Sequence, residues 1–316
     1  MGDVDRMRGI VTAVNEWKMT KQWLTQCDKK GRTPLHLASL SGYMKVVRFI
    51  VKEIVGSTKD EILRKQYVNL PDNKGRTPLF HAAAQGRPNV VRFLIERDAD
   101  LEAATNESHT EPGSTALMAC AEKNNLECFS SLLDKGANVL AIRKDGADAT
   151  YMAARYGHVK IIQEIAESEK MKLIVNRPSF RGRTPILTAA FHGHIKVCKV
   201  LHGKGADLDH QDDDKFTALI YAASQGHFDI VRWLVKKGAN LYLKDRYQDI
   251  ASTSADAYGH PEIAKYLRMW NRDGDSNNEP EDLHTKLEQS KRISGRALYP
   301  SDQMLPKKSS LKRISR

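Results

Sequence analysis

Three groups of side chains in this sequence have the types and spacing to do chemistry: four cysteines, four histidines that each follow a glycine, and three consecutive aspartates. The cysteines form no CxxC pair and no zinc-binding pattern, so we expect small buried apolar groups in a reducing, intracellular compartment. The histidines have no metal-binding partner at a useful spacing, and the aspartates fall at an expected turn. These residues are Cys27, Cys120, Cys128 and Cys198; His158, His194, His227 and His260; and Asp212, Asp213 and Asp214.

No enzyme motif accompanies these residues. The chain lacks the GxxxxGK[ST] phosphate loop, the GxSxG nucleophile turn and the HExxH metalloprotease motif. We therefore predict that the chain is not an enzyme and has no catalytic residue, metal or cofactor. No apolar run approaches the length needed to cross a membrane.

The ordered part of the sequence is occupied by a repeated phrase: a turn, then Thr-Pro-Leu, small residues, Gly, and a stretch with helical periodicity. It is clearest at residues 31–42, 75–86 and 182–193. The positions that align with its proline are Pro34, Pro78, Ala116, Ala149, Pro185, Ala218 and Ala251. Their successive differences are 44, 38, 33, 36, 33 and 33 residues, which indicates a 33-residue unit with three insertions.

This phrase resembles the signature T-P-L-H-x-A of the ankyrin-repeat family, whose unit has the same length, and Thr33 to Ala38 match it fully. The resemblance covers about residues 28 to 270. It implies an all-α solenoid of stacked helix-turn-helix units with hairpin fingers between them. The expected seven units are residues 28–71, 72–109, 110–142, 143–178, 179–211, 212–244 and 245–270.

The physical chemistry of each unit agrees with that fold. Thr33 can cap the first helix, and Pro34 can occupy the first helical position, where its missing N–H costs nothing. Gly42 ends the helix, since a positive φ is cheap only for glycine. The second helix is apolar on one face, as at Val46 and Ile50. Neither helix buries enough surface alone, so the units must stack.

Four segments depart from the regular unit. Residues 1–27 are expected to form N-terminal capping helices, which cover the exposed end of an array. The insertion at residues 59–68 predicts a lengthened helix or an extra one, and that at residues 105–112 predicts a polar loop. Residues 271–316 lose the periodicity and are poor in apolar residues, which predicts a disordered tail with a basic end.

In the ankyrin family, partners usually bind the hairpin tips and the exposed face of the first helix. Units four and five place arginines and aromatic residues at these positions, which are the residue types that most often dominate binding energy. Guanidinium groups also suit carboxylate and phosphate. The alternative is that these side chains pack against the next hairpin. The predicted partner-binding residues are Arg155, Tyr156, Phe180, Arg181, Arg183, Phe191 and His192.

The tail contains Lys-Arg-Ile-Ser twice, at residues 291–294 and 312–315. Two basic residues, a spacer and a serine resemble the substrates of basophilic kinases. We predict phosphorylation at Ser294 and Ser315, where phosphate would replace local positive charge with about −2. The alternative is a chance pattern in a basic tail.

The net charge of +11 favours an acidic partner. The leading hypothesis is a protein-binding adaptor or scaffold that uses the concave face and hairpin tips and is regulated by tail phosphorylation. We expect a monomer in the cytoplasm, with the nucleus as a further location, and a protein partner with an acidic or phosphorylated surface. One alternative is a nucleic-acid or anionic-membrane binder, ranked lower because the basic residues are scattered among acids. The other is a regulatory or targeting subunit of an enzyme.

Overall fold

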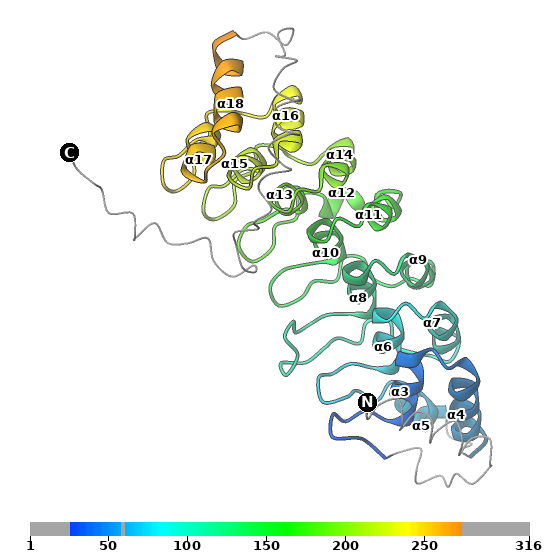
Figure 1. The fold of residues 1–316 in the computed structure, drawn as a ribbon. Helices are drawn as coiled ribbons and strands as arrows, with labels where there is room; N and C mark the ends of the chain where they lie inside the picture. The colour runs from blue at the N-terminus through cyan, green and yellow to red at the C-terminus, as the bar shows by residue number, and fades with distance from the viewer. Residues whose placement is uncertain (1–25, 58–60, 274–316) are drawn as a thin grey trace. The chain divides into compact units, whose positions relative to one another are not determined.

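The computed structural model describes residues 26–57 and 61–273. Within these ranges every regular element is a helix, and most of the helices pair into seven consecutive hairpins (Figure 1). The pairs are α3 (Pro34–Ser41) with α4 (Met44–Ser57), α6 (Pro78–Ala84) with α7 (Pro88–Ile95), α8 (Ala116–Lys123) with α9 (Leu126–Asp134), α10 (Ala149–Arg155) with α11 (Val159–Ala166), α13 (Pro185–Phe191) with α14 (Ile195–Gly203), α15 (Ala218–Ser224) with α16 (Phe228–Lys236), and α17 (Ala251–Ala257) with α18 (Pro261–Asp273). The expected all-α repeat fold is confirmed.

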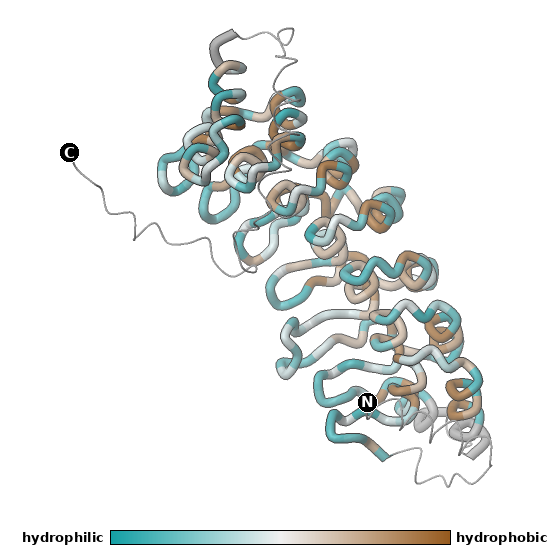
Figure 2. The backbone as a smooth tube through the Cα atoms, viewed as in Figure 1, coloured by the Kyte–Doolittle hydropathy of each residue, from teal (hydrophilic) through white to brown (hydrophobic). Residues whose placement is uncertain are grey.

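The helices form two layers. Each first helix packs against the first helix of the next unit, from α3 through to α17, and the second helices from α4 to α16 pack in the same order. The apolar faces of both layers meet between them, and Figure 2 shows hydrophobic residues along the helices and hydrophilic residues in the connecting loops. Buried side chains such as Leu35, Ile50 and Leu94 are fully removed from solvent, so the core runs through the whole stack.

The starts and ends of the first helices follow the recurrent phrase. Thr77 has an extended backbone, and its hydroxyl accepts a hydrogen bond from the N–H of Phe80. Gly42 ends α3 in the left-handed region, with φ of 78°. In α8 the same place is taken by Asn124, with φ of 60°, which is the non-glycine residue type that tolerates this conformation best.

A tight turn, here called a finger, precedes each first helix. In each finger the N–H of its first residue donates to the carbonyl of its last, as from Asp72 to Arg76 at 2.9 Å. The fingers are residues 28–32, 72–76, 105–114, 143–147, 179–183, 212–216 and 245–249. Successive fingers are also joined by backbone hydrogen bonds, for example from the N–H of Phe180 to the carbonyl of Asp145 at 2.8 Å.

The structure departs from the regular unit at the insertions and from the expected bounds at the end of the last unit. The helix expected in the first insertion is α5 (Glu61–Val68). The sequence did not indicate α12 (Met171–Ile174), a single turn that buries Met171 and Ile174 and accounts for the longer fourth unit. Helix α18 continues to Asp273, three residues past the expected end of the seventh unit. Most of the expected capping segment, and the tail with Ser294 and Ser315, lie outside the described residues.

Candidate functional site

The seven predicted binding residues lie in two places of units four and five. Arg155 is the last residue of α10 and Tyr156 follows it, while Phe191 is the last residue of α13 and His192 follows it. The other three belong to finger five. We call all seven residues the central strip: Arg155, Tyr156, Phe180, Arg181, Arg183, Phe191 and His192.

Tyr156 presents an aromatic ring to solvent at the end of α10. The residue is 40% exposed. The guanidinium of Arg155 lies over its ring at 5.5 Å from the ring centre, and the imidazole of His158 stacks on it at 6.0 Å. A ring held by two neighbours loses little conformational entropy when a partner covers it, so this position suits binding.

Phe191 and His192 form the corresponding end of α13. Their rings meet edge to face at 4.9 Å, and both residues are half-buried. Burial, together with the positive charge of Arg155, lowers the pKa of His192 to about 4. His192 is therefore neutral at physiological pH and can offer a partner a hydrogen bond, but not a positive charge.

Arg183 is largely buried, which for this residue agrees with the alternative that the side chain packs against the next hairpin. Its side chain is only 18% exposed, and Nε lies 3.5 Å from the carboxylate of Asp212. Its guanidinium lies 5.6 Å from the ring centre of Phe191 and 5.1 Å from that of Tyr221. Arg183 therefore joins units five and six, and removing it is expected to lower stability as well as any binding.

Phe180 and Arg181 lie at the tip of finger five. Phe180 is 79% exposed, and Arg181 is also exposed. In the described part of the chain, no ring contact or ion pair links either side chain to the other five residues. The structure therefore divides the central strip into an exposed tip (Phe180 and Arg181) and a helix-end cluster (Arg155, Tyr156, Phe191 and His192), with Arg183 packed below them.

The histidines that follow glycine hold the helix ends in place. Nε2 of His194 donates to the carbonyl of Arg155 at 3.1 Å, and Nε2 of His227 donates to that of Phe191 at 3.0 Å. A Cβ on Gly193 would lie 2.7 Å from the His227 ring, so glycine is needed there for space as well as for its φ of 82°. These histidines are structural, and they position the backbone of the central strip.

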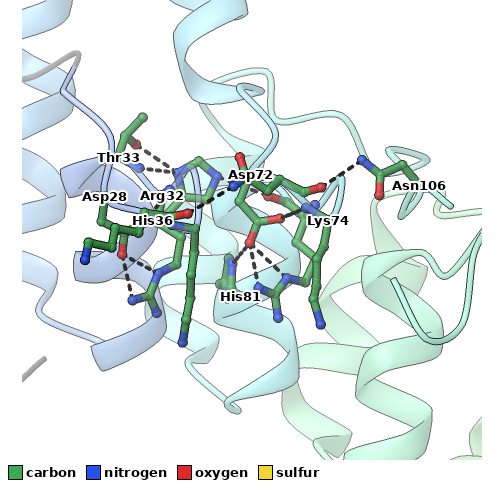
Figure 3. Close-up of polar contacts among 12 residues, drawn as sticks. Asp28, Arg32, Thr33, His36, Asp72, Lys74, His81 and Asn106 are labelled. Atoms are coloured by element: carbon green, nitrogen blue, oxygen red, sulfur yellow. Dashed lines mark hydrogen bonds and ion pairs between the residues drawn. The ribbon is translucent and has the colours of Figure 1, made fainter. Parts of the chain in front are cut away.

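Fingers one and two show how the units are joined by polar contacts (Figure 3). Nδ1 of His36 accepts a hydrogen bond from the N–H of Thr33 at 3.1 Å, and its Nε2 donates to the carbonyl of Arg76 in the next finger at 3.1 Å. Burial lowers the pKa of His36 to about 4, which fits a neutral ring in this role.

The carboxylate of Asp72 is the centre of finger two (Figure 3). Burial works against its ionisation. Hydrogen bonds from Nε2 of His81 at 3.0 Å and Nε of Arg76 at 2.9 Å outweigh burial and hold the pKa of Asp72 well below its usual range. Asp72 is therefore ionised, and its carboxylate has a structural role as the acceptor of these hydrogen bonds.

Sequence reasoning missed Tyr221, although a spacing could have indicated it. Its hydroxyl donates to Asp212, nine residues earlier, which is also the spacing between Asp72 and His81. Asp212 also accepts the backbone N–H groups of Asp214 and Phe216. The first of the three consecutive aspartates is thus a buried structural group.

Among the other chemistry-bearing side chains, the thiols of Cys120 and Cys128 lie within hydrogen-bond distance of each other. No group of three His, Cys, Asp or Glu residues that could hold a metal ion occurs among residues 26–57 and 61–273. Cys120, Cys128 and Cys198 are buried as expected, whereas Cys27 is exposed. Burial raises the pKa of the Cys198 thiol to about 12. No helix in the described ranges is both long and apolar enough to span a membrane.

The comparisons with known proteins agree with the repeat architecture. The family described as ankyrin repeats (3 copies) matches residues 10–105, 101–177, 167–245 and 188–279. Among solved structures, the ankyrin repeat domain of Bcl-3, a member of the IkappaB protein family, matches with a TM-score of 0.59 and 24% identity. That match covers 75% of this chain and 100% of the other, and it shows a shared fold.

Two curated relatives contain similar segments. The chain is 32% identical over 119 residues to an ankyrin repeat and KH domain-containing protein of Caenorhabditis briggsae, covering 37% of this chain and 4% of that protein. It is 29% identical over 107 residues to human transient receptor potential cation channel subfamily A member 1, and this match covers 34% of this chain and 10% of that protein. The chain therefore spans a tenth or less of the length of these relatives.

Proposed function

We propose that this chain, which belongs to the ankyrin-repeat family, is a non-catalytic adaptor that binds an acidic or phosphorylated segment of a partner protein. Ankyrin arrays commonly act as protein-interaction modules, because stacked units present an extended surface. The proposed contact surface is the helix-end cluster together with the exposed tip of finger five.

The observation that carries this proposal is the exposed Tyr156 ring under the guanidinium of Arg155. A partner carboxylate or phosphate can pair with the guanidinium while apolar atoms next to it cover the ring. Two acidic side chains of neighbouring fingers are ion-paired within the protein, Asp145 with Arg143 and Asp212 with Arg183.

The exposed tip adds a second anchor. Phe180 is 79% exposed, a high value for a large apolar side chain, and Arg181 follows it. Burying a phenylalanine side chain in a complex is worth about 2 kcal/mol. A partner that reaches both the tip and the helix ends would gain from two separate anchors.

The test compares two double variants of the full chain in affinity purification with quantitative mass spectrometry. Tyr156→Ala with Arg181→Ala changes the proposed surface, and Lys199→Ala with Lys237→Ala is a control on exposed positions of the second-helix layer. We expect proteins with acidic or phosphorylated segments to be depleted about tenfold by the first pair, since each lost hot-spot side chain costs at least about 1 kcal/mol. Equal recovery with both double variants would refute the proposal.

A second candidate function is supported by the second-helix layer. Lys196, Lys199, Lys204 and Lys237 are exposed on or next to α14 and α16, where Asp229 is the acidic residue of the two helices. Such a surface favours nucleic acid or an anionic membrane. Binding to RNA or to phosphatidylserine vesicles that falls steeply between 50 and 200 mM salt, and that the Lys199→Ala and Lys237→Ala pair weakens, would favour this candidate.

Regulation by the tail and the cellular context belong to the same proposal. We propose phosphorylation of Ser294 and Ser315, a monomeric chain, and a cytoplasmic location with access to the nucleus. An adaptor of this kind can also act as the targeting subunit of an enzyme, which copurification of a catalytic chain would reveal. The test is mass spectrometry of the protein purified from cells. If both serines are always unmodified, regulation by phosphorylation of the tail is refuted.

A further inference from the structure

In four of the seven fingers, an aspartate at the first position closes the turn through its side chain. Its Oδ1 accepts hydrogen bonds from the backbone N–H groups two and four residues later, at 2.8 to 3.0 Å. These anchors are Asp28, Asp72, Asp212 and Asp245. Fingers three and four use other acceptors, since Thr105 Oγ1 accepts from Ser114 N–H and Asp145 Oδ1 accepts from Ala147 N–H.

Finger five has Ser179 at the anchor position. Its backbone keeps the pattern, because the N–H of Ser179 donates to the carbonyl of Arg183 at 2.9 Å. Among residues 26–57 and 61–273, however, the N–H groups of Arg181 and Arg183 and the Oγ of Ser179 make no hydrogen bond. Finger five therefore has the backbone of an anion-capped turn without a carboxylate at the anchor position.

The arginine of finger five makes different contacts from the arginines of fingers one and two. In fingers one and two the arginine four residues after the anchor binds it, with Arg32 Nη2 2.8 Å from Asp28 and Arg76 Nη2 2.7 Å from Asp72. Arg183 has the same position relative to Ser179. Without an anionic anchor in its own finger, Arg183 lies 3.5 Å from the carboxylate of Asp212 in the next finger and against the rings of Phe191 and Tyr221.

The surroundings of Ser179 match the substrate chemistry of a basophilic protein kinase. Arg177 precedes it by two residues, Arg181 and Arg183 follow by two and four, and Phe180 follows directly. Pro178, Phe180 and Arg181 are exposed and Ser179 is half-buried, so the segment lies at the surface.

We propose that Ser179 is a phosphorylation site, modified by a basophilic kinase and a nucleoside triphosphate. The γ-phosphoryl group passes to Oγ of Ser179 as the bond to the β-phosphate oxygen breaks. The hydroxyl proton leaves to a base of the kinase, and the nucleoside diphosphate is released. The phosphate then takes the place of the missing carboxylate, accepts the N–H groups of Arg181 and Arg183, and pairs with the Arg183 guanidinium.

This modification would act on the central strip. About two negative charges beside Phe180 and Arg181 cancel the positive charge of the exposed tip and repel an acidic partner segment. This consequence rests on the proposed function, whereas the modification itself does not. Phosphorylation of finger five would thus release a partner that the unmodified finger binds.

The test uses the full chain carrying Ser294→Ala and Ser315→Ala, so that tail serines cannot accept phosphate. It is incubated with protein kinase C and ATP, and peptides are mapped by mass spectrometry. We expect phosphate on Ser179, none there after Ser179→Ala, and slower transfer after Arg181→Ala. Hydrogen exchange at the amides of Arg181 and Arg183 should become about tenfold slower in the phosphorylated chain.

Two results would overturn the proposal: no phosphate on Ser179 in the folded chain, or phosphate there with unchanged exchange at both amides. The variant Ser179→Asp gives an independent check, because an aspartate anchor should slow the same two amides without any kinase. None of these readouts needs a partner. Loss of partner capture is measured separately. A failure of the proposed function would therefore not contradict phosphorylation of Ser179, and absence of phosphate on Ser179 would not contradict the proposed function.

Discussion

Asp148 caps α10 at the place where five other first helices have threonine, and replacing it with threonine should stabilise the protein. The residue is 2% exposed, and its Oδ1 accepts the N–H of Tyr151 at 2.8 Å. Burial raises its pKa from 3.8 to about 6, although the guanidinium of Arg177 lies 3.7 Å away. Threonine keeps an acceptor for the cap and removes the buried charge.

The magnitude follows from the pKa. A rise from 3.8 to about 6 corresponds to about 3 kcal/mol, at about 1.4 kcal/mol for each pKa unit. Because the folded-state pKa is raised, stability is lost as the pH rises from 3.8 towards 6, and the full cost is present above pH 6. Relaxation around the new side chain and the lost Arg177 pairing reduce the gain, so we expect about 1 to 3 kcal/mol, or about 3 to 10 °C in Tm.

The assay is thermal unfolding of the wild-type chain and Asp148→Thr between pH 4 and pH 8. The Tm of the variant should exceed that of the wild type most at pH 7 to 8, and the difference should shrink towards pH 4. Asp213→Thr, at the exposed tip of finger six, is the matched control for the same substitution at the surface and should change the Tm little. A variant with lower Tm at pH 7.5, or an equal difference at both ends of the range, would refute the reasoning.

Three further predictions concern the frame that holds the central strip. Arg183→Ala should cost about 2 kcal/mol of unfolding free energy in urea titrations, because Asp212 loses its guanidinium; an unchanged midpoint would show that the contact contributes nothing. Gly193→Ala should cost about 1 to 3 kcal/mol, since φ is 82° and a Cβ meets His227, and a Tm equal to wild type would contradict this. His36 has a pKa lowered to about 4, so its contribution to stability is present above pH 6.5 and is lost as the pH falls towards 4. His36→Gln should therefore flatten the dependence of Tm on pH over that window, and an unchanged slope would exclude His36 as its source.

The recurrent phrase predicted the repeat frame well because its signals are local. Thr77 caps its own helix and Gly42 ends its own helix, so a single unit contains the reason for both. The insertion helix α5 was also predictable from its own composition. The short helix α12 was not, since four residues are too few for a period to be recognised.

The central strip was predictable in position but only partly in exposure. Tyr156 and Phe180 are exposed as expected, because tips and helix ends face solvent in each unit. Arg183 is covered because Tyr221 and Asp212 of the next unit lie against it, and the burial of a side chain by a neighbouring unit cannot be read from its own unit.

The central claim is that the partner binds across the helix-end cluster of units four and five, and a photo-crosslinking experiment in cells tests it most directly. A photoreactive amino acid is placed at Tyr156 in one version of the chain and at Lys199, in the second-helix layer, in another. The account predicts crosslinked peptides rich in acidic or phosphorylated residues from position 156 and none of these from position 199. Crosslinks to the same partner from position 199 alone, or peptides at position 156 that are basic, would contradict it.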